Sequence, residues 1–271
     1  MRVSFTKMHG LANDFVILDE RAGGRAPSPE QCRFLANRRR GVGCDQVIYL
    51  QPSTSPMADI RMRIFNADGG EVETCGNATR CVGALLMNGR DHFVIESAAG
   101  LLDIRRHGDR FAVDMGLVRL DWLEIPLAQA CDTLHVPLAL GPLSDPVAVN
   151  VGNPHAVFFV ADCTTIDLEQ YGPMLEHHAL FPQRANIEIV TCHGHDRLRM
   201  RVWERGVGIT AACGTGACAA LVAAHRRGLT GRRAEVELDG GRLEIEWLKG
   251  NHVLMTGPAS LSFHGEIDLD G

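Results

Sequence analysis

Lysine is nearly absent from this sequence of 271 residues. Of its 27 basic residues only Lys7 and Lys249 are lysines, and the other 25 are arginines. Enzymes that use pyridoxal phosphate need a lysine for the Schiff base and a cradle for the phosphate. Neither lysine lies beside a glycine-rich loop. The scarcity of lysine therefore disfavours this cofactor.

Long apolar runs are also missing. The longest, Ala217–Ala224, is far short of the roughly 20 residues that a membrane-spanning helix needs. The first residues lack the apolar core of a signal peptide. A formal net charge of −6 provides no electrostatic attraction to nucleic acid or to an anionic membrane. We therefore expect a cytoplasmic protein that binds neither nucleic acid nor membrane.

The nine cysteines are odd in number and lack the regular spacing of a disulfide framework, which favours free thiols. Cys81 and Cys218 follow Cys75 and Cys213 by six and five residues, so they lie on other faces of a helix, and these spacings do not suit zinc. We expect no metal site. Seven cysteines are interpreted as core residues: Cys32, Cys44, Cys81, Cys131, Cys163, Cys192 and Cys218.

The sequence contains a long internal repeat. The segment IRMRIFNADGGEVETC, which begins at Ile60, aligns without a gap on LRMRVWERGVGITAAC, which begins at Leu198, at a constant offset of 138 residues. Further on, the segment from Gly100 aligns with the segment from Gly241 at an offset of 141. Such a register predicts that the chain is a duplication of one structural unit.

Each copy shows the same order of expected elements. Side chains alternate in polarity over 60–65 and 198–203, which predicts half-buried strands. A Cys-Gly pair follows each strand, and then a helix is expected over about 77–87 and 215–227, with Asn77 and Thr215 as N-caps. Further strands are expected over 93–96, 101–106, 234–238 and 243–247.

The two helices are apolar nearly all round, so a sheet should wrap each of them. We predict an α+β fold of two pseudo-symmetric duplicated domains, each a mixed β-sheet or barrel around a central helix. The expected domains are residues 1–118, which carry Cys75, and residues 119–257, which carry Cys213.

The repeat makes Cys75 and Cys213 equivalent. If the copies pack about an approximate twofold axis, the two thiols face each other across an interdomain cleft. Each precedes a helix N-terminus, which should lower the thiol pKa from about 8.5 toward neutrality and can hold a carboxylate on backbone N–H groups.

Two opposed thiols suit the inversion of a carbon next to a carboxylate. One thiolate removes a proton from one face of the carbon, and the other thiol delivers a proton to the opposite face. Two helix N-termini can stabilise the charge that develops on the carboxylate. This pattern predicts a racemase or epimerase that needs neither metal nor cofactor.

The copies differ just after the first repeated strand. Asn66-Ala67 in the first copy corresponds to Glu204-Arg205 in the second. An arginine can bind a second carboxylate through two hydrogen bonds, and a glutamate can accept from an ammonium group. The difference predicts a substrate with two carboxylates.

The sequence resembles the diaminopimelate epimerase family. The resemblance covers nearly the whole chain, with the motifs in the family's order. The matching segments are His9-Gly-Leu-Ala-Asn-Asp-Phe, Gly41-Val-Gly-Cys-Asp-Gln, Phe65-Asn-Ala-Asp-Gly, Cys75-Gly-Asn, Gly152-Asn-Pro-His, Ala185-Asn-Ile-Glu, Trp203-Glu-Arg-Gly and Cys213-Gly-Thr-Gly-Ala-Cys.

The resemblance implies a cofactor-independent epimerase that interconverts LL- and meso-2,6-diaminoheptanedioate in lysine and peptidoglycan biosynthesis. It also implies a homodimer, and a C-terminal tail, residues 258–271, that returns to the first domain. It implies that Cys75 and Cys213 are the acid/base thiols and that His155 and Glu204 tune them. The implied substrate-binding residues are Asn13, Gln46, Asn66, Gly76, Asn77, Asn153, Asn186, Glu204, Arg205, Gly214 and Thr215.

Three departures from the family's pattern lie near the expected chemistry, at Thr74, Ala78-Thr79 and Ile209. They leave open a related racemase, independent of pyridoxal phosphate, that acts on another amino acid. An isomerase that uses a carboxylate base, and a non-catalytic binding protein, are the alternatives from other classes. The two thiols could also form a regulatory disulfide.

Overall fold

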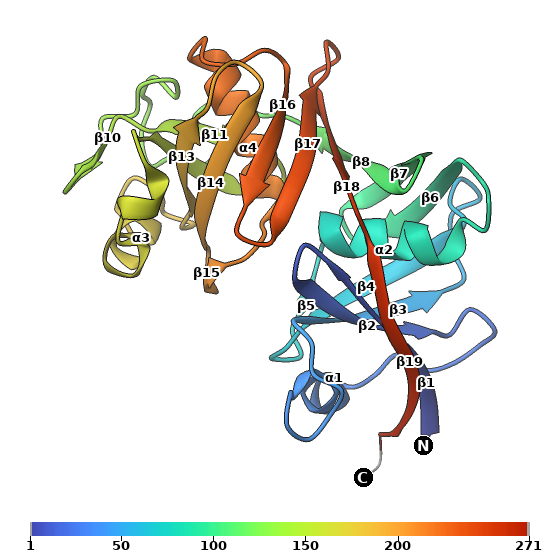
Figure 1. Ribbon diagram of the computed structural model, residues 1–271. Coiled ribbons are helices and arrows are strands. Elements are labelled where there is room, and N and C mark those ends of the chain that lie inside the picture. The colour runs from blue at the N-terminus through green and yellow to red at the C-terminus, as the bar shows by residue number, and fades with distance from the viewer. Residues whose placement is uncertain (1, 270–271) are drawn as a thin grey trace. The chain divides into compact units, whose positions relative to one another are not determined.

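The computed structural model describes residues 2–269, which form two compact units (Figure 1). Unit 1 combines the residues up to Val113 with those from Gly257 onward, and unit 2 comprises Asp114–Thr256. The chain enters unit 2 within strand β8 (Arg110–Leu117) and leaves it at the end of strand β18 (His252–Gly257).

Unit 1 is a mixed sheet with two helices. Its elements are β1 (Arg2–Gly10), β2 (Asn13–Asp19), α1 (Pro29–Ala36), β3 (Gln46–Gln51), β4 (Ile60–Asn66), β5 (Glu71–Val72), α2 (Gly76–Leu86), β6 (His92–Ser97), β7 (Gly100–His107) and, from the end of the chain, β19 (Ser260–Asp268). Figure 1 shows α1 and α2 on opposite faces of strands β2–β4.

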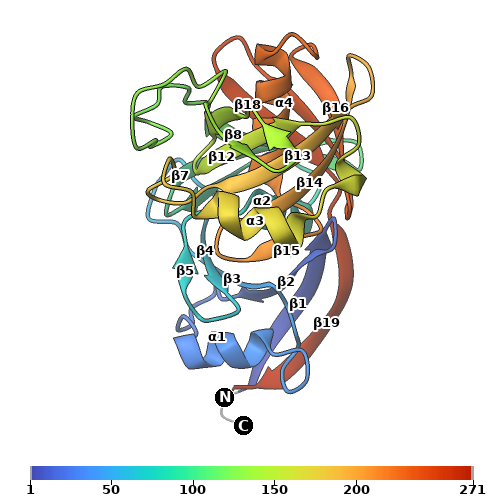
Figure 2. The same cartoon turned by 90° about the vertical axis from the view of Figure 1, so that its left-hand side faces the viewer.

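Unit 2 repeats this arrangement. Its elements are β9 (Ala139–Leu140), β10 (Leu143–Ser144), β11 (Val147–Asn150), β12 (Pro154–Phe159), a 3-10 turn (Cys163–Thr165), α3 (Leu168–Glu176), β13 (Asn186–Cys192), β14 (Arg197–Glu204), β15 (Gly208–Thr210), α4 (Gly214–Arg226), β16 (Arg233–Leu238) and β17 (Gly241–Trp247). Helix α3 packs on β13, β14 and β15 (Figure 2).

Strand pairing follows one order in both units. In unit 1, β1–β2 is antiparallel, β2–β3 parallel, β3–β4 antiparallel, β4–β6 parallel and β6–β7 antiparallel. In unit 2 the same sequence of directions links β11, β12, β13, β14, β16 and β17. The predicted duplication and the mixed sheets are therefore confirmed.

The central helices are buried, as their apolar composition predicts. Every residue of α4 from Gly216 to Ala224 is buried, and the helix contacts β11–β14, β16 and β17. Helix α2 contacts β1 and β7, and a Cβ atom added at Gly83 would lie 3.0 Å from Ile104. Small residues let these helices approach the surrounding sheet closely.

Two details of the sequence-based picture are wrong. The helices begin at Gly76 and Gly214, so the N-caps are Cys75 and Cys213 rather than the predicted Asn77 and Thr215. The reason is that Asn and Thr are only statistically preferred caps, whereas here the backbone turns out of the extended conformation at the cysteine itself. Among the cysteines predicted to be in the core, Cys131 and Cys192 are only half-buried.

Candidate active site

Asn13 is positioned by a strained turn. Gly10 pairs with Asn13 across the β1–β2 hairpin, so the loop consists of Leu11 and Ala12 alone, with φ values of 58° and 66°. Two residues with positive φ make this a type I′ turn, which normally carries Asn and Gly. Leucine and alanine are held there at a cost of about 1–2 kcal/mol each. Such strain is typical of functional sites.

The first thiol lies next to two asparagine side chains. The Cys75 Sγ atom donates to Asn13 Oδ1 at 3.8 Å, and Asn77 Nδ2 donates to the same oxygen at 3.1 Å. Asn77 is 3% exposed, and its own oxygen accepts from Arg80 Nη2 at 2.9 Å. Three of the predicted site residues are thus in contact within unit 1.

Gln46 and Asn66 form a second pair in unit 1. They are opposite each other at the paired ends of β3 and β4, and Gln46 Nε2 donates to Asn66 Oδ1 at 2.9 Å. Among residues 2–269, the buried Gln46 Oε1 atom has no hydrogen-bond partner. A buried acceptor without a partner is costly, and a donor from a bound substrate would satisfy it.

The second thiol is buried at the start of α4. Cys213 is 5% exposed, and its Sγ atom accepts from the Gly216 backbone N–H at 3.3 Å and lies 3.5 Å from Thr215 Oγ1. Cys213 also hydrogen-bonds the Glu204 carboxyl, which accepts from Thr210 as well. The residues predicted to sit at this corner are therefore together in unit 2.

Burial governs the proton affinities at this corner. It raises the pKa of the Cys213 thiol well above its usual value, and the negative charges of Glu204 and Glu188 raise that pKa further. Burial also raises the pKa of the Glu204 carboxyl, while hydrogen bonds from Thr210 and Cys213 oppose the change. The prediction of a lowered thiol pKa is wrong for Cys213, because loss of hydration and two nearby carboxylates outweigh the helix N-terminus.

A buried histidine and glutamate lie beside this corner. His155 and Glu188 are both 0% exposed, and His155 Nδ1 lies 2.7 Å from Glu188 Oε1. The other ring nitrogen, Nε2, lies 2.7 Å from Asn153 Oδ1. A Cβ atom added at Gly216 would lie 2.9 Å from Glu188 Oε1 and 3.2 Å from Cys213 Sγ. The Glu188 Oε1 atom thus lies close both to His155 and to the first turn of α4.

Glu188 was missed as a site residue by sequence reasoning, although it ends the quoted Ala185-Asn-Ile-Glu motif. Its neighbours on β13 are the buried Ile187 and Ile189. A glutamate in the middle of an apolar strand is the signal that could have identified it, since a buried carboxylate needs a partner.

Asn186 and Arg205 are linked through the backbone. Asn186 Oδ1 accepts from the Arg205 N–H at 3.0 Å, and Asn186 Nδ2 donates to the Pro154 carbonyl at 3.0 Å. The Arg205 side chain is exposed, and its Nη1 atom donates to the Gln183 carbonyl at 3.2 Å. Asn186 therefore fixes the start of the loop that presents the arginine.

Known proteins of one family are similar to this chain over nearly its whole length. The diaminopimelate epimerase family profile matches residues 5–120 and 147–262. A diaminopimelate epimerase of Rhodospirillum centenum is 57% identical over 266 residues, which cover 97% of this chain and 91% of that protein. One of Erythrobacter litoralis is 55% identical and covers 99% of this chain and 98% of its own. The chain belongs to the diaminopimelate epimerase family.

Solved structures share the fold of this family member at low identity. A probable proline racemase from Agrobacterium radiobacter has a TM-score of 0.69 at 17% identity and covers 99% of this chain and 93% of its own. A hydroxyproline epimerase from Agrobacterium vitis has a TM-score of 0.67 at 16% identity, covering 100% of this chain and 93% of its own. At these identities the likeness concerns the fold alone.

The sequence predicts neither a metal-binding cluster nor a membrane-spanning helix among residues 2–269. Within them, no cluster of three or more His, Cys, Asp or Glu side chains is arranged to hold a metal ion. None of the helices there is both long and apolar enough to cross a membrane. The expectation that Cys75 and Cys213 face each other depends on the relative placement of the two units and stays a prediction.

Proposed function

We propose that this chain interconverts LL- and meso-2,6-diaminoheptanedioate by a two-thiol mechanism, in the cytoplasmic synthesis of lysine and peptidoglycan precursors. The full-length similarity to diaminopimelate epimerases is the observation that carries the reaction. The presence of both cysteines, each as the N-cap of a buried helix, supports the mechanism.

The proposed chemistry begins with one of the two thiols as thiolate. It takes the proton from the α-carbon, and the C–H electron pair becomes the carbanion, delocalised into the carboxylate. The other thiol then gives its proton to the opposite face of the same carbon, so the configuration inverts and the thiolate has moved to the second sulfur. No electrons are gained or lost, so the step needs no oxidant or reductant.

Backbone N–H groups are proposed to hold the reacting carboxylate. They belong to the first turns of α2 and α4, where the N–H groups have no partner within the helix. The helix dipoles add partial positive charge at the same points, which stabilises the carboxylate as it takes up the charge of the carbanion. The proposed donors are Gly76, Asn77, Gly214 and Thr215.

Glu204 is the group proposed to control the protonation of Cys213. It is hydrogen-bonded to that thiol, and burial raises the pKa of its carboxyl, so the carboxyl is a stronger base than an exposed glutamate. A carboxyl of this kind can take the thiol proton when the thiolate is required and return it afterwards. His155, held between Glu188 and Asn153, is proposed to act in the same tuning.

The polar side chains of the site are proposed to grip the remainder of the substrate. Arg205 would bind the distal carboxylate, and the unpartnered Gln46 oxygen would accept from an ammonium group. The other residues proposed for the amino groups and the distal carboxylate are Asn13, Asn66, Asn153, Asn186 and Glu204.

The test of the mechanism is proton exchange in heavy water. Incubation with LL-diaminopimelate, without added cofactor and after dialysis against a chelator, should place deuterium at the inverted α-carbon. Cys75→Ala and Cys213→Ala should each abolish inversion, and Cys131→Ala serves as a control with the same chemical change at a half-buried position. Full inversion by either of the first two variants would reject the two-thiol mechanism.

The second carboxylate of diaminopimelate distinguishes the proposed function from that of a racemase for a different amino acid. Arg205→Met should raise the KM for LL-diaminopimelate by about 10- to 100-fold, the value of a charged hydrogen bond, with a smaller effect on kcat. The wild-type enzyme should not racemise monocarboxylic amino acids at a comparable rate. Equal turnover of such a panel would favour the alternative.

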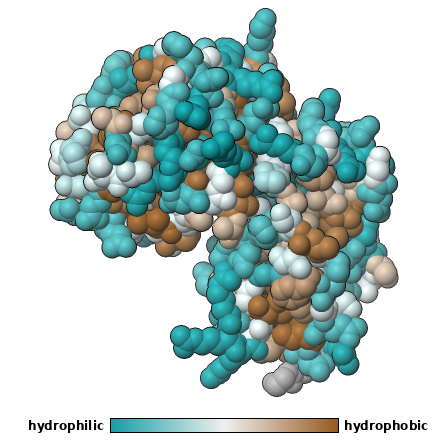
Figure 3. All heavy atoms as spheres, in the orientation of Figure 1, coloured by the Kyte–Doolittle hydropathy of each residue, from teal (hydrophilic) through white to brown (hydrophobic). Residues whose placement is uncertain are grey.

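We further propose that the protein is a homodimer formed through β19. This nine-residue strand pairs with β1 along its length, and among residues 2–269 no strand is found in register with its other edge. Leu261 is 54% exposed and Phe263 is 49% exposed, and Figure 3 shows apolar residues in brown along this face of unit 1. Long exposed apolar edges are otherwise avoided because they aggregate.

The assembly can be measured by light scattering on a sizing column. Phe263→Glu should convert the dimer to a monomer, because a charge would be buried at the contact. Met57→Glu, at a residue that is 69% exposed elsewhere in unit 1, should leave the dimer intact. A monomeric wild-type protein at micromolar concentration would refute the proposal.

A further inference from the structure

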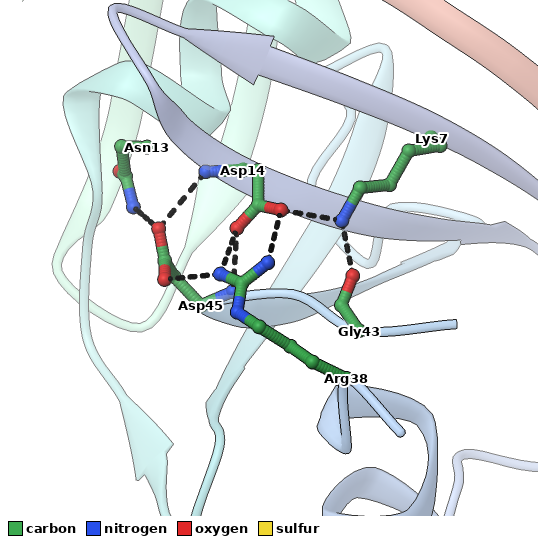
Figure 4. Close-up of polar contacts among 6 residues, drawn as sticks. All are labelled: Lys7, Asn13, Asp14, Arg38, Gly43 and Asp45. Atoms are coloured by element: carbon green, nitrogen blue, oxygen red, sulfur yellow. Dashed lines mark hydrogen bonds and ion pairs between the residues drawn. The ribbon is translucent and has the colours of Figure 1, made fainter. Parts of the chain in front are cut away.

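A cluster of charged side chains in unit 1 contacts Asn13, the residue that accepts a hydrogen bond from Cys75. Asp14 and Asp45 are joined by the guanidinium of Arg38, which donates through Nη2 to Asp14 Oδ1 at 2.8 Å and to Asp45 Oδ1 at 2.9 Å (Figure 4). Lys7, one of the two lysines, donates to Asp14 Oδ2 at 2.6 Å and to the Gly43 carbonyl. These four charged residues are called the Arg38 cluster below.

The Arg38 cluster is rigidly connected. Arg38 Nη1 also donates to Asp14 Oδ2 at 2.9 Å, so the guanidinium binds this carboxylate through two nitrogens. The Asp45 backbone N–H donates to Asp14 Oδ1 at 2.9 Å. Lys7 is only 9% exposed in its side chain, and a buried ammonium needs such partners. Asp45 is therefore bonded to Arg38 through its side chain and to Asp14 through its backbone.

Asp45 transmits this rigidity to the thiol corner. Its Oδ2 atom accepts from Asn13 Nδ2 at 2.9 Å and from the Asp14 backbone N–H at 3.0 Å. Figure 4 shows the Asn13 amide beyond Asp45, on the side away from Arg38. A carboxylate can only accept, so it must face the NH2 group of the amide. The Asn13 oxygen is thereby turned toward Asn77 and Cys75.

We propose that Asp45, held by Arg38 and Asp14, is a positioning residue that fixes the Asn13 amide with its oxygen toward the Cys75 thiol. This inference rests on the proposed function only in taking Cys75 as a catalytic thiol. Asn77 Nδ2 holds the same Asn13 oxygen, so two groups oppose rotation of the amide. Without the charge of Asp45 one of the two is weakened, and the amide can rotate by half a turn and present its NH2 group to the sulfur. The strained Leu11-Ala12 turn places Asn13 within reach of both partners.

The orientation of the amide decides which form of the thiol is favoured. An oxygen accepts a hydrogen bond from S–H but repels a thiolate, whereas an NH2 group stabilises the thiolate. The Arg38 cluster therefore keeps Cys75 protonated and ready to act as the proton donor. Asp45 thus acts on the thiol electrostatically and indirectly. It contacts Asn13, and Asn13 contacts the Cys75 sulfur.

The experiment measures the pH at which Cys75 reacts half-maximally with iodoacetamide. Cleavage after Arg63 and Arg80 releases a peptide, residues 64–80, in which Cys75 is the single cysteine, so mass spectrometry reports this thiol alone. Asp45→Asn should lower the midpoint by about 0.5 to 1 pH unit, the contribution of one hydrogen bond. Asp19→Asn, at the far end of β2 where Asp19 pairs with Arg21, should leave it unchanged.

A purely structural role for Asp45 would raise the alkylation rate at every pH without moving the midpoint, and that outcome overturns the proposal. A second test uses Asn13→Ala, which removes the oxygen and should lower the midpoint by itself. Asp45→Asn should then have no further effect in the Asn13→Ala background. An equal shift in both backgrounds would show that Asp45 does not act through Asn13.

If Asp45→Asn does not fold, Arg38→Gln provides the same test, because it removes the guanidinium that holds the Asp45 carboxylate. The Arg38 side chain is 59% exposed, so its loss should be tolerated, and the midpoint should move in the same direction by a smaller amount. The readout needs no substrate. A midpoint that shifts in an enzyme unable to epimerise diaminopimelate would therefore reject the proposed function alone, and an active enzyme with an unmoved midpoint would reject this inference alone.

Discussion

Glu188 and His155 form a hydrogen-bonded pair that is completely shielded from solvent, with 2.7 Å between Oε1 and Nδ1. The second Glu188 oxygen has no hydrogen-bond partner among residues 2–269. The register of two parallel strands produces the pair, because His155 on β12 is opposite Asn186 on β13, two residues before Glu188. The carboxylate fixes the imidazole orientation next to the Cys213 corner.

Glu188→Gln should weaken this control of His155. The amide can still hydrogen-bond the ring but has no charge and offers one acceptor oxygen instead of two. We expect kcat to fall by about 10- to 100-fold, the range found for groups that orient metal-bound histidines, and stability to fall by about 1–3 kcal/mol. Steady-state kinetics and urea unfolding measure the two effects. Glu237→Gln, at a half-buried glutamate on β16 that pairs with Arg242, is the matched control. Unchanged kcat would leave Glu188 with a packing role only.

Glu204→Gln should make Cys213 a stronger acid. The negative charge of Glu204 is one cause of the raised thiol pKa, so its removal lowers that pKa while the effect of burial remains. The pH midpoint for alkylation of Cys213 should therefore move down. Peptide mapping of residues 206–226 with fragment sequencing separates Cys213 from the buried Cys218. A midpoint that rises or stays constant would contradict this electrostatic account.

Gly216→Ala should lower activity without the usual gain in helix stability. Alanine in place of glycine within a helix normally stabilises it by about 1 kcal/mol. At Gly216 the new Cβ atom would lie 2.9 Å from Glu188 Oε1 and 3.2 Å from Cys213 Sγ, so both groups must shift. We expect kcat to fall at least about tenfold, since small misplacements of reacting groups are costly. Gly250→Ala, where no atom lies within 4 Å of the added carbon, is the control.

Asp14 should make unit 1 sensitive to acid. Burial alone would raise the pKa of this carboxyl, but hydrogen bonds and charges from Arg38 and Lys7 lower it well below 3.8. A lowered folded-state pKa stabilises the protein above about pH 4, and this stability is lost as the pH falls toward the folded-state value. The difference in unfolding free energy between wild type and Asp14→Asn should therefore shrink between pH 6 and 3 in urea titrations. A difference that is constant with pH would exclude this linkage.

Much of the fold was accessible from the sequence because it is written in local patterns. Alternating polarity predicted the strands that the structure places at Ile60–Asn66 and Arg197–Glu204, and the constant offset of the repeat predicted that they are equivalent. The apolar surface of the helices predicted that both would be buried. The pattern of apolar residues along the chain is sufficient to predict these features, because a half-buried strand and a buried helix each require a characteristic pattern.

The thiol pKa and the side-chain contacts around the site could not be predicted from local sequence patterns. The helix N-terminus at Cys213 suggested an acidic thiol, but the sum of burial and two carboxylates reverses the sign. Glu188 comes 25 residues before Cys213 in the chain, and nothing local marks the two as neighbours. Likewise, Arg38 contacts Asp45, which contacts Asn13, and nothing local in the sequence marks these three residues as neighbours.

The sequence by itself determined the duplicated architecture and the family, because both depend on residue order and on motifs within a few positions. For the same reason it predicts Cys75 and Cys213 as the two reactive sulfur atoms. Only the tertiary structure decided which charges and acceptors surround Cys75 and Cys213 in their own units. Electrostatic effects on a thiol depend on distance through space and on loss of hydration, and both are set by packing rather than by separation along the chain.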